Sequence, residues 1–138
     1  LDALQAEYGV PPQYLMAFWG IETNYGTFMG DFRVVRSVAT LACMTKRKEF
    51  FSNEAVQALR ILNSNHMTSD QMRGSWAGAM GNMQFMPSTF TRWAVDRDGN
   101  GRIDIWNSLP DAFASASRLS QSARITCTDR RATSRTSS

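Results

Sequence analysis

The segment 12–25 combines a helical apolar face with a carboxylate, and this combination constrains the fold more than any other feature of the chain. Pro11 and Pro12 suit a helix start, because the first turn tolerates a missing N–H and a fixed φ. Apolar side chains then recur at the spacing of one helical face, which ends at Glu22. The residues on that face are Leu15, Phe18, Trp19 and Glu22. We therefore predict an amphipathic helix over residues 12–25.

Glu22 is the first candidate for a chemical role. A glutamate on an aromatic face loses hydration, and this loss raises its pKa because it disfavours the charged form. A carboxyl group that keeps its proton near neutral pH can act as a general acid. The alternative is that Glu22 lies at the edge of the apolar stripe, where its carboxylate reaches water or caps a neighbouring helix.

The rest of the chain also favours helices. No segment alternates apolar and polar residues with the period of two that a half-buried strand requires. Further helices are expected at residues 37–42, 49–62 and 111–119. In the longest of them, the expected inward side chains are Phe50, Val56, Leu59 and Leu62. We therefore predict an all-α fold with one hydrophobic core, which a chain of this length can bury.

A block rich in small residues, 74–88, is the second candidate region. Its glycines allow sharp turns and close approach of a ligand to the backbone. Polar side chains at Ser75, Asn82 and Gln84 lie among aromatic residues, a mixture typical of a sugar-binding wall. The alternative is a tightly packed corner in the fold. The methionines are expected in the core in either case; they are Met80, Met83 and Met86.

The segment 96–104 matches the first nine positions of an EF-hand loop. Oxygen-bearing side chains occupy positions 1, 3, 5 and 9, and glycine occupies position 6. The usual final glutamate is replaced by Asn107, although Asp111 could supply an oxygen if the loop folds back. We expect a weak, structural site for Ca²⁺ or Na⁺. The alternative is a set of Asx turns without a cation.

Charge and composition exclude two classes of protein. The net charge of +3 comes from residues 121–138, so residues 1–120 are neutral and offer no basic face for nucleic acid. No apolar run approaches the length of about 20 residues that spans a bilayer. His66, the single histidine, lies in a polar link and has no catalytic partner near it in sequence. Residues 120–138 are rich in serine, threonine and arginine, and we expect them to form a disordered tail.

Five sequence blocks occur in the order in which they occur in one known family. The blocks are residues 18–26, 37–41, 77–81, 84–88 and 94–96, the last leading into the aspartate-rich loop. On these blocks the chain resembles the lytic murein transglycosylase B family of peptidoglycan-cleaving enzymes over residues 5–119. The resemblance implies a lysozyme-like α domain with an EF-hand-like cation loop, here covering 1–119. Because the match ends near Leu119, we expect this domain to be truncated at its C-terminus.

The resemblance also implies roles for individual residues. Glu22 matches the catalytic glutamate, and Ser75 and Gln84 match residues that line the glycan groove. Lys46 and Arg47 stand where the family has arginines that contact the substrate. The aspartate-rich loop matches the family's EF-hand-like cation site. By the loop spacing its candidate ligands are the side chains of Asp96, Asp98, Asn100, Asp104 and Asp111 and the backbone carbonyl of Arg102.

Enzymes of this family cleave the bond between N-acetylmuramic acid and N-acetylglucosamine without water. The muramyl C6 hydroxyl attacks its own anomeric carbon and leaves a 1,6-anhydro sugar. One glutamate serves as acid and then base, because intramolecular attack gains from proximity and the second carboxylate of ordinary glycosidases is less necessary. The resemblance implies that no cofactor is needed for the chemistry. It further implies peptidoglycan glycan strands as the partner, a monomer, and a location in the bacterial periplasm or cell envelope.

Two other hypotheses start from the same residues. A truncated, catalytically weak domain of the same fold could bind glycan strands without cleaving them. A Ca²⁺ sensor would require paired EF-hand loops with flanking amphipathic helices, whereas the sequence has one loop without the final glutamate.

Overall fold

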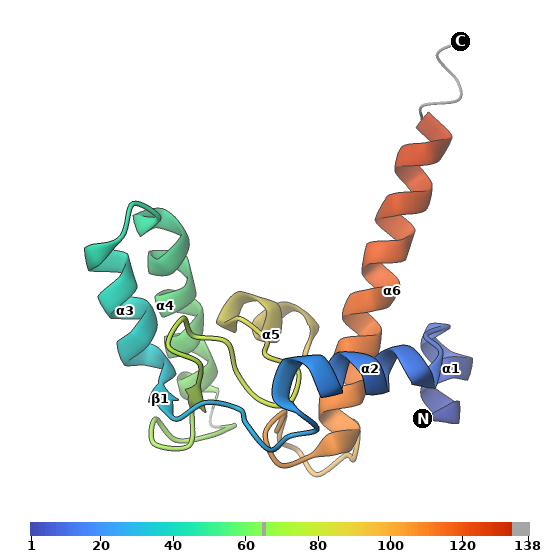
Figure 1. The fold of residues 1–138 in the computed structure, drawn as a ribbon, viewed down its shortest axis with the longest axis horizontal. Helices are drawn as coiled ribbons and strands as arrows, with labels where there is room; N and C mark the ends of the chain where they lie inside the picture. The colour runs from blue at the N-terminus through green and yellow to red at the C-terminus, as the bar shows by residue number, and fades with distance from the viewer. Residues whose placement is uncertain (65, 134–138) are drawn as a thin grey trace.

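The computed structural model describes residues 1–64 and 66–133, and it describes side chains up to residue 123. This part of the chain forms six helices and two short strands. In chain order they are α1 (Asp2–Tyr8), α2 (Pro12–Thr23), β1 (Phe32–Arg33), α3 (Val34–Met44), α4 (Lys48–Asn63), β2 (Arg73–Gly74), α5 (Pro87–Trp93) and α6 (Leu109–Thr133). Figure 1 shows α3 and α4 packed together at one end, with α1 and α2 beside α6 at the other. The predicted all-α class is confirmed.

Within the described residues, the departures from that class are a two-stranded sheet and the isolated bridges that Met80 makes with Gly74 and Phe85. β1 pairs with β2 in antiparallel register, with Phe32 opposite Gly74. The strands are only two residues long, too short to show the alternation that marks a strand in a sequence. Gly30 lies beside this pairing with a φ of 89°, and a Cβ there would lie 2.3 Å from the carbonyl oxygen of Gly74. Only glycine allows this approach.

The predicted inward face of α4 was wrong. The helix occurs as expected, but Phe50, Val56 and Leu59 are exposed, and of the four predicted residues Leu62 alone packs against the core, partly buried. The residues that it buries are Phe51, Glu54, Ala58 and Ile61. The apolar pattern misled because one of the inward positions carries a charged side chain, so the true face lies about one residue around the helix from the predicted one.

Glu54 is buried because its carboxylate has partners. Its two oxygens accept hydrogen bonds from the Ser88 backbone N–H at 2.9 Å and the Ser88 hydroxyl at 2.7 Å. Ser88 lies in the first turn of α5, where backbone N–H groups have no partner within the helix. The carboxylate therefore joins α4 to α5 and satisfies that helix start.

Residues 120–133, expected to be part of a disordered tail, are helical and belong to α6. Helix α6 continues past Leu119 to Thr133, and Ser120, Gln121 and Ser122 are still half-buried. Residues 111–133 contain neither glycine nor proline, so nothing in the local sequence breaks the helix. The end of the expected tail, residues 134–138, lies outside the described residues. In Figure 1 the C-terminal part of α6 extends away from the other helices. None of the described helices is long and apolar enough to cross a membrane.

Helix α2 packs on α6 through an aromatic contact. The Trp19 ring lies edge-on to the Phe113 ring, with 5.3 Å between the ring centroids. Leu15 and Thr23 are buried on the same side of α2, whereas Phe18 is exposed. The buried face of α2 is thus formed by Leu15, Trp19 and Thr23. Phe18 and Glu22, the other two residues of the predicted face, lie at its edge.

The amide of Asn82 joins three segments that are distant in sequence. Asn82 is 3% exposed, and its Oδ1 accepts a hydrogen bond from Trp19 Nε1 at 2.8 Å. Its Nδ2 donates to the carbonyl oxygens of Ile105 at 3.1 Å and Trp106 at 2.8 Å. Its backbone carbonyl accepts from Thr23 Oγ1 at 3.0 Å. This network attaches the end of α2 to the segment that follows the aspartate-rich loop.

We predict that Asn82→Ala lowers the free energy of unfolding by about 2–4 kcal/mol, because it leaves buried groups without hydrogen-bond partners. Asn82→Asp should also destabilise the protein, since a carboxylate can accept from Trp19 but cannot donate to the two carbonyls. Equilibrium unfolding in urea measures both effects. The control is Asn63→Ala on the exposed end of α4, which should change stability by less than about 0.5 kcal/mol. A similar effect of Asn82→Ala and Asn63→Ala would contradict the role of the network.

Candidate functional site

Glu22 lies in the last turn of α2, directly before a strained turn of the backbone. The side chain is half-buried, and its carboxylate makes no hydrogen bond or ion pair within the described part of the chain. Asn24 and Tyr25 follow with φ angles of 48° and 57°, in the left-handed region that non-glycine residues seldom adopt. Such conformations persist where the surrounding structure holds them, and they cluster at functional sites.

Thr23 holds this turn in place. Its hydroxyl accepts a hydrogen bond from the Gly26 backbone N–H at 3.0 Å and donates to the Asn82 carbonyl. Its own carbonyl accepts from the Phe28 backbone N–H at 3.0 Å. Because Thr23 is buried and follows Glu22 directly, the position of the Glu22 backbone is fixed by the core.

Apolar side chains on the outer face of α2 and just beyond it are exposed to solvent. We call this surface the α2 apolar face; it comprises Tyr14, Phe18, Ile21, Tyr25 and Phe28. The Tyr25 ring packs edge-on against Trp19 with centroids 5.5 Å apart, and it covers Gly20, where a Cβ would lie 2.9 Å from Tyr25 Cζ. Exposed apolar surface of this extent marks a contact with a ligand or another part of a protein.

A hollow of about 530 Å³ opens beside the end of α2. We call it the loop hollow; it is lined by residues 26–31 together with Gln71, Arg73, Trp106 and Asn107. Glu22 does not line it. The hollow begins four residues after Glu22, on the same turn that Thr23 holds.

Ser75 and Gln84 lie in the segment that packs against the loop hollow, although neither lines it. Gln84 Nε2 donates to the carbonyl oxygens of Met29 at 3.2 Å and Gly81 at 3.0 Å. Gln84 therefore holds one wall of the hollow through Met29. Ser75 Oγ accepts from the Ala79 backbone N–H at 3.1 Å and is half-buried. Gln84, like Tyr25, has a positive φ, of 47°.

Of the other side chains singled out in this block, Met80, Met83 and Asn82 are buried, whereas Met86, which was also expected in the core, is half-buried. Met80 and Met83 are buried, as predicted. Asn82, which the sequence suggested as part of a sugar-binding wall, is used inside the protein instead.

Lys46 and Arg47 lie apart from the loop hollow, at the junction of α3 and α4. Both are exposed. The Arg47 guanidinium lies 4.2 Å from the centroid of the Phe50 ring, a cation–π contact within its own helix start. The structure does not bring these two residues to the hollow beside Glu22.

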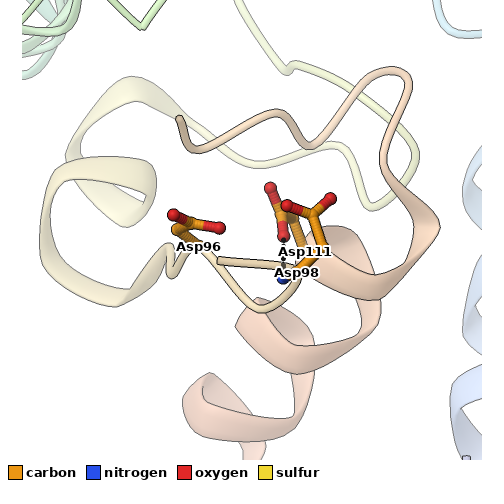
Figure 2. Close-up of side chains that lie close together, drawn as sticks. All are labelled: Asp96, Asp98 and Asp111. Atoms are coloured by element: carbon orange, nitrogen blue, oxygen red, sulfur yellow. Dashed lines mark hydrogen bonds between the residues drawn. The ribbon is translucent and has the colours of Figure 1, made fainter. Parts of the chain in front are cut away.

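The aspartate-rich loop brings three carboxylates together. Oxygen atoms of Asp96, Asp98 and Asp111 all lie within 4.8 Å of one another, and Figure 2 shows the three side chains converging. Asp111, the seventh residue after Asp104, does fold back as the sequence suggested. It is 0% exposed and accepts hydrogen bonds from the backbone N–H groups of Arg97 at 2.8 Å and Asp104 at 2.9 Å.

The remaining predicted ligands are used in other ways. The Asp104 carboxylate accepts from the backbone N–H groups of Trp106 at 3.0 Å and Asn107 at 2.9 Å, and it is not part of the three-carboxylate cluster. Asn100 Oδ1 accepts from the Arg102 backbone N–H at 2.9 Å. Asx-type turns, the alternative to a cation site, therefore occur within the same loop as the carboxylate cluster.

The ionisation of Asp96 suits a cation. Partial loss of hydration raises the pKa of Asp96, but backbone N–H groups of Gly101, Gly99 and Asn100 that donate to the carboxylate outweigh it and hold the pKa below its ordinary value. The carboxylate is therefore ionised at neutral pH. Three clustered carboxylate groups supply the hard oxygen atoms that Ca²⁺ prefers.

Several residues near the site could not be identified from sequence pattern. Trp106 is buried, and its Nε1 donates to the Arg73 carbonyl at 2.7 Å. The Arg73 guanidinium donates to the Asp31 carbonyl at 2.8 Å, and both residues line the loop hollow. His66 Nδ1 accepts from the Ile103 backbone N–H at 3.1 Å, which agrees with a structural role.

Comparison with known proteins agrees with the arrangement of these elements. The model of the transglycosylase SLT domain family matches residues 1–123. Membrane-bound lytic murein transglycosylase B of Escherichia coli (strain K12) is 39% identical over 109 residues, which are 78% of this chain and 30% of that protein.

Solved structures of similar proteins superpose closely. SltB3 from Pseudomonas aeruginosa, in complex with NAG-NAM-pentapeptide, has a TM-score of 0.85 and 44% identity, covering 88% of this chain and 32% of that one. The same protein in complex with NAG-anhNAM-pentapeptide has a TM-score of 0.84 over the same shares of both chains. Escherichia coli Slt35 in complex with calcium has a TM-score of 0.84 and 36% identity, covering 88% of this chain and 39% of that one.

The chain thus spans between 30% and 39% of the length of these relatives. The match to the family model, in contrast, covers residues 1–123, from the start of α1 to the middle of α6. The chain therefore belongs to the transglycosylase SLT domain family.

Proposed function

We propose that this chain is catalytic machinery of a peptidoglycan lytic transglycosylase, which cleaves the bond between N-acetylmuramic acid and N-acetylglucosamine. The observation that carries the proposal is a glutamate at the end of α2, beside an open hollow, in a chain that belongs to the SLT domain family. The complexes of SltB3 with NAG-NAM-pentapeptide and NAG-anhNAM-pentapeptide support both the substrate class and a 1,6-anhydro product.

Glu22 performs both proton transfers in this proposal. Its carboxylic acid donates a proton to the glycosidic oxygen while the bond from that oxygen to the muramyl C1 breaks. The muramyl C6 oxygen then attacks C1, and the Glu22 carboxylate takes the proton of the C6 hydroxyl. Glu22 returns to its acid form and no water is consumed. Because the nucleophile belongs to the sugar that it attacks, a second carboxylate is not required.

The surroundings of Glu22 support the handling of sugars. Exposed aromatic rings on the α2 apolar face, such as Tyr25 and Phe28, can pack against the apolar faces of sugar rings. Gln84 fixes the wall of the loop hollow through Met29, and Ser75 lies in the same segment. We assign Lys46 and Arg47 a weaker contact with the substrate, since they lie apart from the hollow.

The location and partner follow from the substrate. The partner is the glycan strand of peptidoglycan, and the protein acts in the bacterial periplasm or cell envelope as a monomer. The murein transglycosylases among its relatives support this placement.

The aspartate-rich loop would hold a structural Ca²⁺ or Na⁺ through Asp96, Asp98 and Asp111. The calcium complex of Slt35 supports Ca²⁺. When bound, the ion supplies charge neutralisation to clustered carboxylates and takes no part in the reaction.

We predict that Glu22→Gln lowers turnover by at least about two orders of magnitude, because the amide keeps the shape of the side chain but has no proton to transfer. The assay is digestion of purified murein, with mass spectrometry of the released anhydro-muropeptides. The matched control is Glu49→Gln, which changes an exposed glutamate on α4 and should leave turnover unchanged.

Activity of Glu22→Gln within a few-fold of the parent would contradict the assignment of Glu22. Binding of glycan strands by the parent without release of anhydro products would contradict the catalytic proposal and support a glycan-binding domain instead.

We predict that millimolar Ca²⁺ raises the Tm of the parent by a few degrees, because an ion that binds only the folded state stabilises it. Asp96→Ala should abolish that rise. Asp2→Ala, which removes an exposed carboxylate from α1, should retain it. Differential scanning calorimetry with and without a chelator measures the shift, and an unmoved Tm of the parent would show that the loop is only a set of turns.

A further inference from the structure

A second hollow, of about 570 Å³, lies between β1, α3 and the segment after β2. We call it the basic hollow. It is lined by Asp31, Phe32, Arg33, Arg36, Ser37, Thr40, Leu41, Arg73 and Trp76. Glu22, Ser75, Gln84 and the residues of the aspartate-rich loop are not among them, and Asp31 and Arg73 are the two lining residues that the basic hollow shares with the loop hollow.

Positive charge predominates in the basic hollow. Three of its lining residues are arginines, against one aspartate. Arg33 is paired with the Asp70 carboxylate at 2.8 Å. Arg73 donates to the backbone carbonyls of Asp31 and Asp70, so these bonds fix its guanidinium without neutralising its charge.

Arg36 is the arginine available to a ligand. Its side chain is exposed, and within the described part of the chain it makes no hydrogen bond or ion pair. A guanidinium offers several N–H donors in a planar arrangement that matches a carboxylate. Thr40 lies one helical turn further along α3, so its hydroxyl is on the same face as Arg36.

An aromatic ring completes the hollow. Trp76 is 65% exposed although it follows the buried Gly74 by only two residues. A cationic side chain, a hydroxyl and an exposed indole in one hollow suit an extended ligand that carries a carboxylate and amide groups. The same ring could pack against apolar side chains of that ligand.

The basic hollow continues the loop hollow. Asp31 and Arg73 line both of them. The two together extend from Gly26, just beyond the catalytic helix, to Trp76. A ligand whose sugar lies beside Glu22 can therefore extend along this path to Arg36.

We propose that the basic hollow binds the peptide attached to the glycan strand, with Arg36 binding a carboxylate of that peptide. This inference rests on the proposed function, because it takes the ligand to be peptide-bearing peptidoglycan. Arg36 is then a specificity-determining residue. It favours strands that carry peptides over strands from which the peptides have been removed.

The test compares two soluble ligands, NAG-NAM-pentapeptide and the NAG-NAM disaccharide without peptide, in titrations followed by NMR. The titrations use the full chain with Glu22→Gln, so that no ligand is cleaved. We expect the pentapeptide form to bind about tenfold more tightly than the bare disaccharide, as one charge-assisted hydrogen-bonded pair allows. Arg36→Ala should remove this preference and leave the affinity for the bare disaccharide unchanged.

Three further variants sharpen the result. Arg36→Lys keeps the charge and should retain part of the preference, whereas Arg36→Glu should weaken binding of the peptide form below that of the bare disaccharide. Arg60→Ala changes an exposed arginine on α4 that does not line the basic hollow, and it should leave the preference intact. In cleavage assays with Glu22 restored, Arg36→Ala should raise KM for peptide-bearing strands and leave kcat unchanged.

Equal binding of the two ligands by the Arg36-containing chain would overturn the proposal, as would an equal loss for both ligands in Arg36→Ala. Its failure is separable from that of the proposed function. A parent that releases anhydro products without any peptide preference retains the function and loses this inference. A chain that prefers the peptide form through Arg36 but cleaves no strand retains this inference and loses the catalytic assignment.

Discussion

The buried amide of Asn82 is the interaction on which the geometry beside Glu22 depends. Its Oδ1 accepts a hydrogen bond from the indole N–H of Trp19, and its Nδ2 donates to the carbonyls of Ile105 and Trp106. These bonds attach α2 to a segment more than 80 residues away in sequence. The backbone of Asn82 also accepts the hydroxyl hydrogen of Thr23. A network in which each buried polar group has a partner is rigid, because any displacement leaves a group unsatisfied.

Two carboxylates show why the sequence predicted helices better than it predicted their faces. Glu54 counts as a surface residue in any apolar pattern, yet its bonds to Ser88 make burial favourable and turn α4 inward at that position. Glu22 was placed on an apolar face, and it lies half-buried at the margin of that face. For Glu54 the deciding contact comes from tertiary structure, which periodicity within one helix does not contain.

The part of the candidate site that could be predicted from sequence is the part that lies within one short segment of the chain. The cluster of Asp96 and Asp98, and the return of Asp111 to it, follow from a spacing that the loop itself imposes. The basic hollow was not predictable in that way. Arg36, Arg73 and Trp76 are brought together by the pairing of β1 with β2, two strands too short to leave a pattern in the sequence.

Asp111 would restrict the size of ion that the aspartate-rich loop can hold. By accepting N–H groups of Arg97 and Asp104, it closes the loop from both ends through the protein's own hydrogen bonds. A loop closed in this way has little freedom to contract around a small ion or expand around a large one, and rigidity is one of the factors that separate Ca²⁺ from Mg²⁺. These hydrogen bonds occupy both carboxylate oxygens of Asp111, which an ion would also use as ligands. For the ion proposed above, folding would therefore limit the size that the loop admits, and it would do so at the expense of affinity.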